Sequence, residues 1–129
     1  MLEKFAQVIL LSILMCYPVL TWANTAHQNY AFDLKLQEYI DVVNQTKMVL
    51  DNPKATPSAL EQKQALCKRI QAYKNIAKLS QENLELDSAP IMNRVSQNFL
   101  DRQEKSFNAS AMSEQVFCAK TTQKDVKIN

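Results

Sequence analysis

The stretch AFDLKLQEYIDVVNQTKMVLD, residues 31–51, shows the pattern that decides the fold. Apolar residues and one threonine recur in it at spacings of three and four, the period of a helix that buries one face. The members of this stripe are Phe32, Leu36, Tyr39, Val43, Thr46 and Leu50, and Ile40 and Val42 widen it on its two flanks. We expect the helix to end at Asn52 and Pro53, because proline cannot continue it.

A second stretch with the same period follows a short linker. Ser58 and Glu61 match a capping box, in which each side chain satisfies a free backbone N–H at the start of a helix. Thr56 with Pro57 is an equally good start, and the helix runs to about Leu86 unless it breaks near Asn83. Its predicted buried stripe is Ala59, Leu66, Ile70, Tyr73, Ala77, Ser80 and Leu84.

A third and a fourth helix complete the expected fold. The third begins at a cap formed by Ser88 or Asp87 and reaches about Phe107. It is expected to bury Met92, Val95, Phe99 and Ile91, with Leu100 and Phe107 on one flank. The fourth, from Ala111 to about Lys120, has only a poor apolar stripe of Met112, Val116 and Ala119, and Phe117 points elsewhere.

The composition agrees with helices joined by short connections. The chain has 129 residues and a net charge of +2, and it contains no glycine. Phosphate-binding loops, dinucleotide fingerprints and nucleophile elbows need glycine, as do most tight hairpins, so these classes are excluded. Each expected break is formed by Asn, Pro, Ser or Thr, so none requires glycine. The prediction is therefore an all-α fold, a small antiparallel bundle of three long helices plus a short C-terminal one.

The first 23 residues have the character of a secretory signal peptide. A weakly positive start precedes an apolar run from Phe5 to Leu20, whose helical part is expected to end at Pro18. Thr21 and Ala23 supply small residues before a cut. The run is shorter than the roughly 20 residues that a membrane span needs, so an uncleaved anchor is the weaker alternative. We expect cleavage after Ala23 and a periplasmic or secreted protein. Residues 24–129 would form a single all-α domain, with 121–129 as a flexible tail.

Two cysteines remain in the expected mature chain, Cys67 and Cys118. Disulfides form by default in exported proteins, and an even number of cysteines leaves no spare thiol. If the third helix folds back on the second at Ser88, residue 109 lies beside Cys67 and Cys118 comes within reach. We therefore predict that one disulfide fastens the weak last helix to the middle of the second.

Residues for catalysis or for holding a metal ion are scarce. The only histidine is His27, near the predicted new N-terminus, where no nucleophile accompanies it. Once the cysteines are paired, only that histidine and scattered carboxylates remain for a metal ion, and Glu82 and Glu85 are best explained as a solvated surface. No catalytic residue, metal ligand or cofactor is expected, and an enzyme is the least favoured class.

The second helix carries one basic face. Lys63, Lys74 and Lys78 lie on the side of Cys67, and the disulfide would bring Lys120 near them. These four lysines form a candidate patch for an anionic partner or a membrane surface, although an ordinary solvated lysine face is the simpler interpretation. Nucleic-acid binding is not expected, because a net charge of +2 is small for it.

The apolar stripes allow two interpretations. They form a closed core, which the modest length of the chain favours, or they leave a groove for a segment of a partner. The plan of a bundle with one disulfide resembles those of secretion pilotins, periplasmic immunity proteins and envelope-stress chaperones, but the repeated Leu-Thr-x-x-Gln signature of the chaperones is missing. The predicted function is binding a protein partner in the bacterial envelope, as an immunity, inhibitor or assembly-accessory protein. Anionic-ligand binding and an envelope chaperone are the alternatives, and the oligomeric state is left open.

Overall fold

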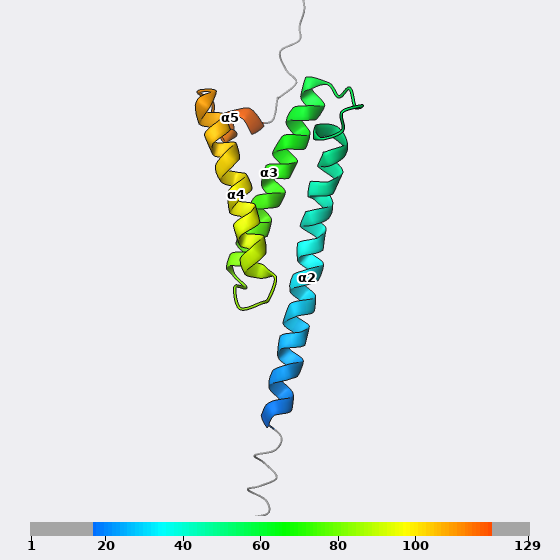
Figure 1. Cartoon of the computed structure of the whole chain (residues 1–129), viewed down its shortest axis with the longest axis vertical. Coiled ribbons are helices and arrows are strands. Elements are labelled where there is room, and N and C mark those ends of the chain that lie inside the picture. Colours follow the sequence, from blue (N-terminus) through cyan, green and yellow to red (C-terminus); the bar gives the residue numbers. More distant parts are fainter. Residues whose placement is uncertain (1–16, 120–129) are drawn as a thin grey trace, which may run out of the picture. The chain divides into compact units, whose positions relative to one another are not determined.

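The computed structural model describes residues 17–119, with side chains from residue 28 onward. The helices, labelled as in Figure 1, are α2 (Tyr17–Leu50), α3 (Ala59–Gln81), α4 (Ala89–Ala109) and the short α5 (Glu114–Cys118). The described part of the chain contains no strand. The predicted all-α fold of three long helices and a short C-terminal one is confirmed. Most of the predicted leader and the tail with Lys120 lie outside the described residues.

The chain divides into two compact units, residues 1–35 and residues 36–129. Within the first unit, the described residues 17–35 are helical throughout and form the first part of α2. The second unit holds the rest of α2 together with α3, α4 and α5. The predicted cut after Ala23 falls inside the first unit, and cleavage there stays a prediction.

The predicted burial of α2 is confirmed for its central stripe. Phe32, Leu36, Val43 and Thr46 are buried, whereas Tyr39 is half-exposed. The helix ends at Leu50, and the side chain of Asn52 then accepts a hydrogen bond from the Lys54 N–H (3.0 Å). This local bond replaces helical bonding, as asparagine side chains often do in turns.

Helix α3 begins at the predicted capping box. The Ser58 hydroxyl accepts a hydrogen bond from the Glu61 N–H (3.2 Å), and the Glu61 carboxylate accepts one from the Ser58 N–H (2.7 Å). Hydrogen bonds that the carboxylate accepts from the Ser58 hydroxyl (2.7 Å) and from the Ser58 N–H lower the pKa of Glu61 below its ordinary value. The helix ends at Gln81, which confirms the alternative of a break near Asn83, since the Asn83 side chain donates to the Leu79 carbonyl (2.7 Å) and the chain turns there. The early end lets Leu86 fold back and become buried.

Helix α4 runs antiparallel to α3 and makes its most extensive helix contact with it (Figure 1). Small residues dominate the buried part of this pair, which lets the two backbones approach closely. These are Ala77, Ser80, Ala89 and Ser96, whereas Ala65 and Ala72 are buried on the side of α3 that faces α2. Ile70 and Ile76 are the large buried side chains of α3. The stripe predicted for α3 is thus correct at Ile70, Ala77 and Ser80, but Ala59 and Leu84 are exposed.

Two predictions for α4 are wrong. Ile91 is 65% exposed and Val95 is 45% exposed, although the pattern placed both in the core. Helical spacing identifies an apolar face, but burial also requires a neighbouring element on that side, and none of the described elements covers these two residues. Ser88 does occupy the cap position of α4, but its side chain makes no capping hydrogen bond.

The connection from α4 to α5 also differs from expectation. Ala111 has a φ of 51°, in the left-handed region that favours glycine, so this break does place a non-glycine residue in a glycine-like conformation. Helix α5 covers only five residues and starts at Ser113, whose hydroxyl accepts a bond from the Val116 N–H (3.3 Å). Phe117 is half-buried while Val116 is exposed, the reverse of the predicted face.

Candidate functional site: an open apolar groove

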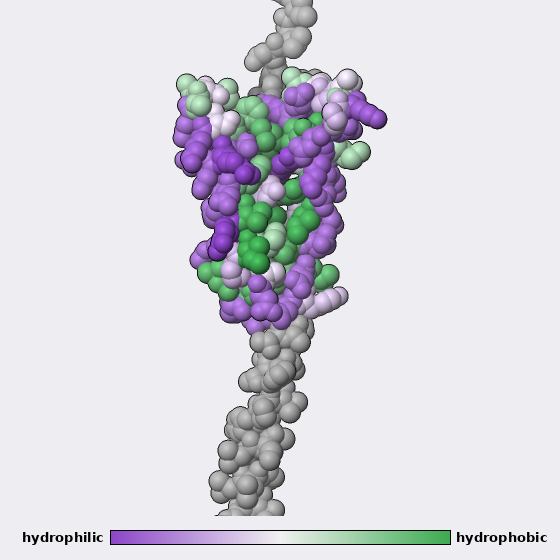
Figure 2. Space-filling view, viewed as in Figure 1, coloured by the Kyte–Doolittle hydropathy of each residue, from purple (hydrophilic) through white to green (hydrophobic). Residues whose placement is uncertain are grey.

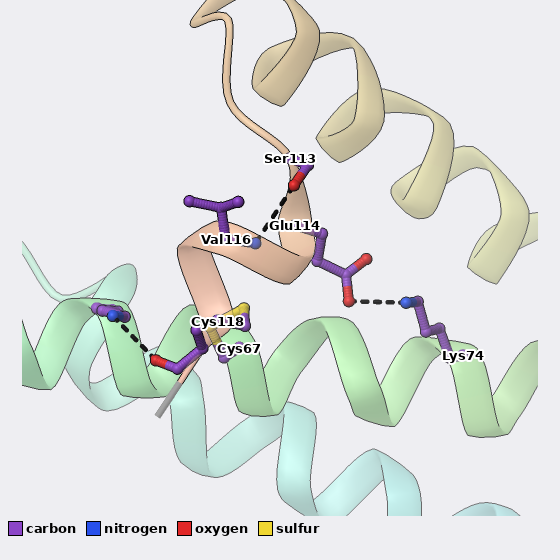
Figure 3. The surroundings of a disulfide bond; sticks show 8 residues. Cys67, Lys74, Ser113, Glu114, Val116 and Cys118 are labelled. Atoms are coloured by element: carbon purple, nitrogen blue, oxygen red, sulfur yellow. Dashed lines mark hydrogen bonds and ion pairs between the residues drawn. A yellow bond between two sulfur atoms is a disulfide. The ribbon is translucent and has the colours of Figure 1, made fainter. Parts of the chain in front are cut away.

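The predicted disulfide is present and joins the middle of α3 to the end of α5 (Figure 3). The Cys67 and Cys118 sulfur atoms are 2.03 Å apart and their Cα atoms 5.7 Å apart. The rings of Phe107 and Phe117 lie beside the link, with centroids 5.3 Å apart. A five-residue helix buries too little surface to hold itself in place, so the covalent bond and this ring pair fix α5 on α3 and α4.

Three lysines of the predicted anionic-partner patch lie on this side, and each has a partner within the chain. The Lys74 Nζ atom is 2.7 Å from the Glu114 carboxylate, as Figure 3 shows. Lys63 donates to the Ala119 carbonyl (3.3 Å), with its charge 6.0 Å from the centre of the Phe117 ring. Lys78 is 3.9 Å from Glu82, four residues further along α3.

The contacts of Lys63 and Lys74 tie α5 and the residue after it to α3, whereas the exposed pair of Lys78 with Glu82 stays at the end of α3. Lys120 lies outside the described residues, so the complete patch stays a prediction. We call this half of the molecule the closed side; it comprises Cys67, Lys74, Phe107, Glu114, Phe117 and Cys118. A cavity of about 260 Å³ remains between α3, α4 and α5, with Ile70, Lys74, Leu100 and Glu114 among its lining residues.

The C-terminal part of α2 is held on α3 by Arg69. Its guanidinium donates to both Asp51 carboxylate oxygens (3.0 and 2.8 Å), and its Nε atom donates to the Thr46 hydroxyl (2.7 Å). The hydrogen bonds and charge of Arg69 lower the pKa of Asp51, against a smaller opposing effect of desolvation. Sequence reasoning missed this cluster, because nothing in a one-dimensional pattern pairs position 69 with position 51.

Between α2 and α4 the apolar surface stays open. The Tyr73 ring of α3 stacks on the Phe99 ring of α4, with centroids 4.0 Å apart, yet both side chains remain half-exposed. Met92 and Val95 precede Phe99 on the same flank of α4, since residues three and four apart share a helix face. The apolar flank therefore continues from the stacked rings into solvent.

The opposite wall of this surface belongs to α2. Arg69 and the residues around Lys68 contact one flank of α2, at Thr46 and Val42. Helical spacing places Ile40 on the other flank, beside the buried Leu36, so Ile40 faces the α4 side. The floor is formed by α3. Leu66 lies seven residues, about two turns, before Tyr73, so the two side chains lie on nearly the same face of α3.

We call this surface the open groove; it comprises Leu36, Ile40, Leu66, Tyr73, Met92, Val95 and Phe99. Figure 2 shows it from the front as an apolar strip between two polar edges. Sequence reasoning proposed a groove only as the less favoured interpretation of the stripes. The exposed apolar side chain of Val95 favours a groove on this flank. The buried stripe of α2 and the buried residues of α3 agree with a closed core elsewhere in the molecule.

The described residues contain no group of three or more His, Cys, Asp or Glu side chains that could hold a metal ion. None of the described helices is both long and apolar enough to cross a membrane. Comparison with known protein families, with curated proteins and with solved structures finds no match to this chain.

Proposed function

We propose that this chain is a protein-binding module of the bacterial cell envelope, and that the open groove takes up a segment of its partner. The observation that carries the proposal is the exposure of Val95 (45%), which lies four residues before the half-buried Phe99 ring on α4. Ile91 (65% exposed), four residues before Val95, extends this apolar surface along α4 beyond the groove. Contiguous apolar surface of this kind is costly in water and commonly marks an interaction site. An immunity, inhibitor or assembly-accessory role would use such a surface.

The leader-like first 23 residues and the Cys67–Cys118 bond support placement outside the cytoplasm, because disulfides persist in oxidising compartments. Cleavage after Ala23 would remove Trp22, the only tryptophan. The protein recovered from the envelope should therefore show tyrosine emission alone, and N-terminal sequencing should begin at Asn24. Tryptophan emission from the recovered protein would contradict the cut.

Site-specific photocrosslinking tests the role of the groove. A benzophenone amino acid placed at Val95 or at Ile91 should yield one discrete adduct with another envelope protein in producing cells. The same probe at Gln97 is the control, because Gln97 is exposed on the other flank of α4. Equal adduct yields at all three positions, or none at Val95 and Ile91, would overturn the proposal.

A further inference from the structure

We infer that the occupant of the open groove is an amphipathic helix with acidic residues on both sides of its apolar stripe. This inference rests on the proposed function and adds the chemistry of the partner. It starts from the directions of the helices, since α2 and α4 both run antiparallel to α3 and so parallel to each other (Figure 1). A helix laid between two parallel helices and onto a third completes a four-helix bundle.

Both edges of the groove are basic at the same height. Thr46 of α2 is level with Arg69 of α3 because they are hydrogen-bonded, and Phe99 of α4 is level with Tyr73 because their rings stack. Because α3 and α4 are antiparallel, four residues before Tyr73 on α3 correspond to four residues after Phe99 on α4. Arg69 is therefore level with residue 103. Lys47 and Arg102 therefore stand across the groove from each other.

Each basic residue also lies on the line of an apolar wall residue. Lys47 follows Ile40 by seven residues and Arg102 follows Val95 by seven, which is two turns, or about 10 Å, on nearly the same face. Neither basic side chain forms an ion pair within the part of the chain that the structure describes, in contrast to the lysines of the closed side. Along the groove, the apolar side chains of Ile40 and Val95 are thus followed, two helical turns further on, by the positive charges of Lys47 and Arg102.

One nearby acidic residue, Asp51, lies four residues beyond Lys47 and interacts with its charge, but the Asp51 carboxylate is bound by Arg69, so these three groups together carry one net positive charge. The other nearby acidic residues point away from the groove. Glu38 and Asp41 lie about 100° or more around α2 from Ile40, and Asp101 and Glu104 lie at least as far around α4 from Val95. An incoming helix with acidic flanks would meet a net positive charge at each edge, from Lys47 and Arg69 less Asp51 on one side and from Arg102 on the other. A basic helix would be repelled, which gives the groove a charge preference.

The same charges disfavour two other occupants. The tail, residues 120–129, contains three lysines and one aspartate, so it carries a charge like that of the edges. A second copy placed face to face, with its helices parallel to these, would bring its Lys47 against Arg102. A partner with acidic flanks is the occupant that the charges favour.

Two synthetic helical peptides of about 18 residues, long enough to line the groove at about 27 Å, test the inference. They share one leucine stripe and differ only in its flanks, which are glutamates in one peptide and lysines in the other. Fluorescence anisotropy with protein produced from the full 129-residue sequence should show at least tenfold tighter binding of the glutamate peptide. Added salt should reduce this preference, because the edge charges are exposed.

The charge-reversal variant Lys47→Glu with Arg102→Glu should prefer the lysine peptide. This reversal is a result that unfolding cannot produce. The matched control Lys54→Glu with Lys68→Glu makes the same charge change, at the linker and at a face of α3 away from the groove, and should keep the original preference. Val95→Glu should weaken binding of the glutamate peptide at least tenfold.

Equal binding of the two peptides, no binding of either, or a preference that survives charge reversal would overturn the inference. A dimer in sedimentation velocity that Val95→Glu dissociates would identify a second copy as the occupant and would also overturn it. A specific crosslink at Val95 without a charge preference would leave the binding function standing and reject only the acidic helix. Absence of that crosslink would reject the binding function itself.

Discussion

The two flanks of α4 face the same solvent and the same helix α3, yet one is covered and the other is not. On the closed side, Phe107 lies against Phe117, and α5 is held by the disulfide and by the ion pair of Lys74 with Glu114. On the flank of the open groove, no element within residues 17–119 covers Val95, which is 45% exposed. The covered flank is thus the one to which a short segment is attached covalently.

The energetic basis of the difference is the length of the covering element. Helix α5 has five residues, and isolated helices shorter than about 12 residues are marginal in water. A segment as short as α5 therefore needs help to stay docked on a flank. The disulfide supplies it, because the bond restricts the conformations that α5 can adopt when it is not docked. No comparable segment lies over the open groove in the part of the chain that the structure describes.

Loss of the disulfide should have the largest effect on this contrast. Replacing both cysteines, as Cys67→Ala with Cys118→Ala, should lower the free energy of unfolding by about 4 kcal/mol, because the bond closes a loop of 51 positions. Urea unfolding followed by circular dichroism measures this value. Amide exchange should show loss of protection in α5, while the stacked pair of Tyr73 and Phe99 is retained. A stability loss below about 1 kcal/mol would mean that α5 is held by its other contacts.

A pair of truncations, one on each flank, should give the next largest effect. Phe117→Ala removes a half-buried ring from the closed side and should cost about 2 kcal/mol. Val95→Ala should change stability by no more than about 0.5 kcal/mol, because Val95 is already 45% exposed and alanine is the better helix former. Equal costs from thermal unfolding would contradict the assignment of one flank as covered and the other as open.

The contact between Arg69 and Asp51 should contribute about 1 kcal/mol near neutral pH, since the pair is bidentate but partly exposed (13% and 49%). The folded pKa of Asp51 lies below its ordinary value, so this stabilisation is present above that value and is lost as pH falls through the lowered pKa. Asp51→Asn should therefore destabilise the protein at pH 7 but hardly at all in strong acid.

Asp101→Asn is the matched control for that prediction, because Asp101 is exposed and forms no ion pair within the described residues. Its effect should stay within about 0.5 kcal/mol at pH 7. Urea titrations of both variants at a series of pH values make the comparison. A constant difference between wild type and Asp51→Asn across the acid range would show that α2 is held by other contacts.

The ion pair of Lys74 with Glu114 should give the smallest effect. A double-mutant cycle with Lys74→Ala and Glu114→Ala should yield a coupling of about 0.5 kcal/mol, as for other exposed pairs. Repeating the cycle without the disulfide should abolish the coupling, because α5 would then no longer be held at α3. A coupling that survives in that background would show that α5 docks without its covalent link.

Much of the fold could be predicted from the sequence, because its determinants are local. The stripe from Phe32 to Thr46, the capping box at Ser58 and the breaks at Asn52 and Ser88 all depend on residues close to one another in the chain. The disulfide followed from helix lengths and a single turn. Long helices joined by short connections leave few other arrangements.

The open groove could not be predicted in the same way, because it depends on whether a neighbouring element covers the flank of α4 that carries Val95. The stripe of α4 is the same whether Val95 meets a neighbour or solvent, so spacing alone placed it in the core. Burial of small residues such as Ala72 and Ser96 was also missed, since close helix approach is a property of a pair of helices. The pairing of Arg69 with Asp51 likewise links two helices and leaves no local signal.

The disulfide also divides the molecule topologically. It closes residues 67–118 into a covalent ring that contains most of α3, the turn at residues 82–88, α4 and α5. Helix α2 lies outside this ring, and its path to the ring runs through the linker and the first turns of α3. A single backbone cut at the turn therefore leaves both pieces joined by the bond, whereas a cut in the linker ends the covalent connection of α2 to the ring. After such a cut, one wall of the open groove would be held only by noncovalent contacts, such as those of Arg69 with Thr46 and Asp51.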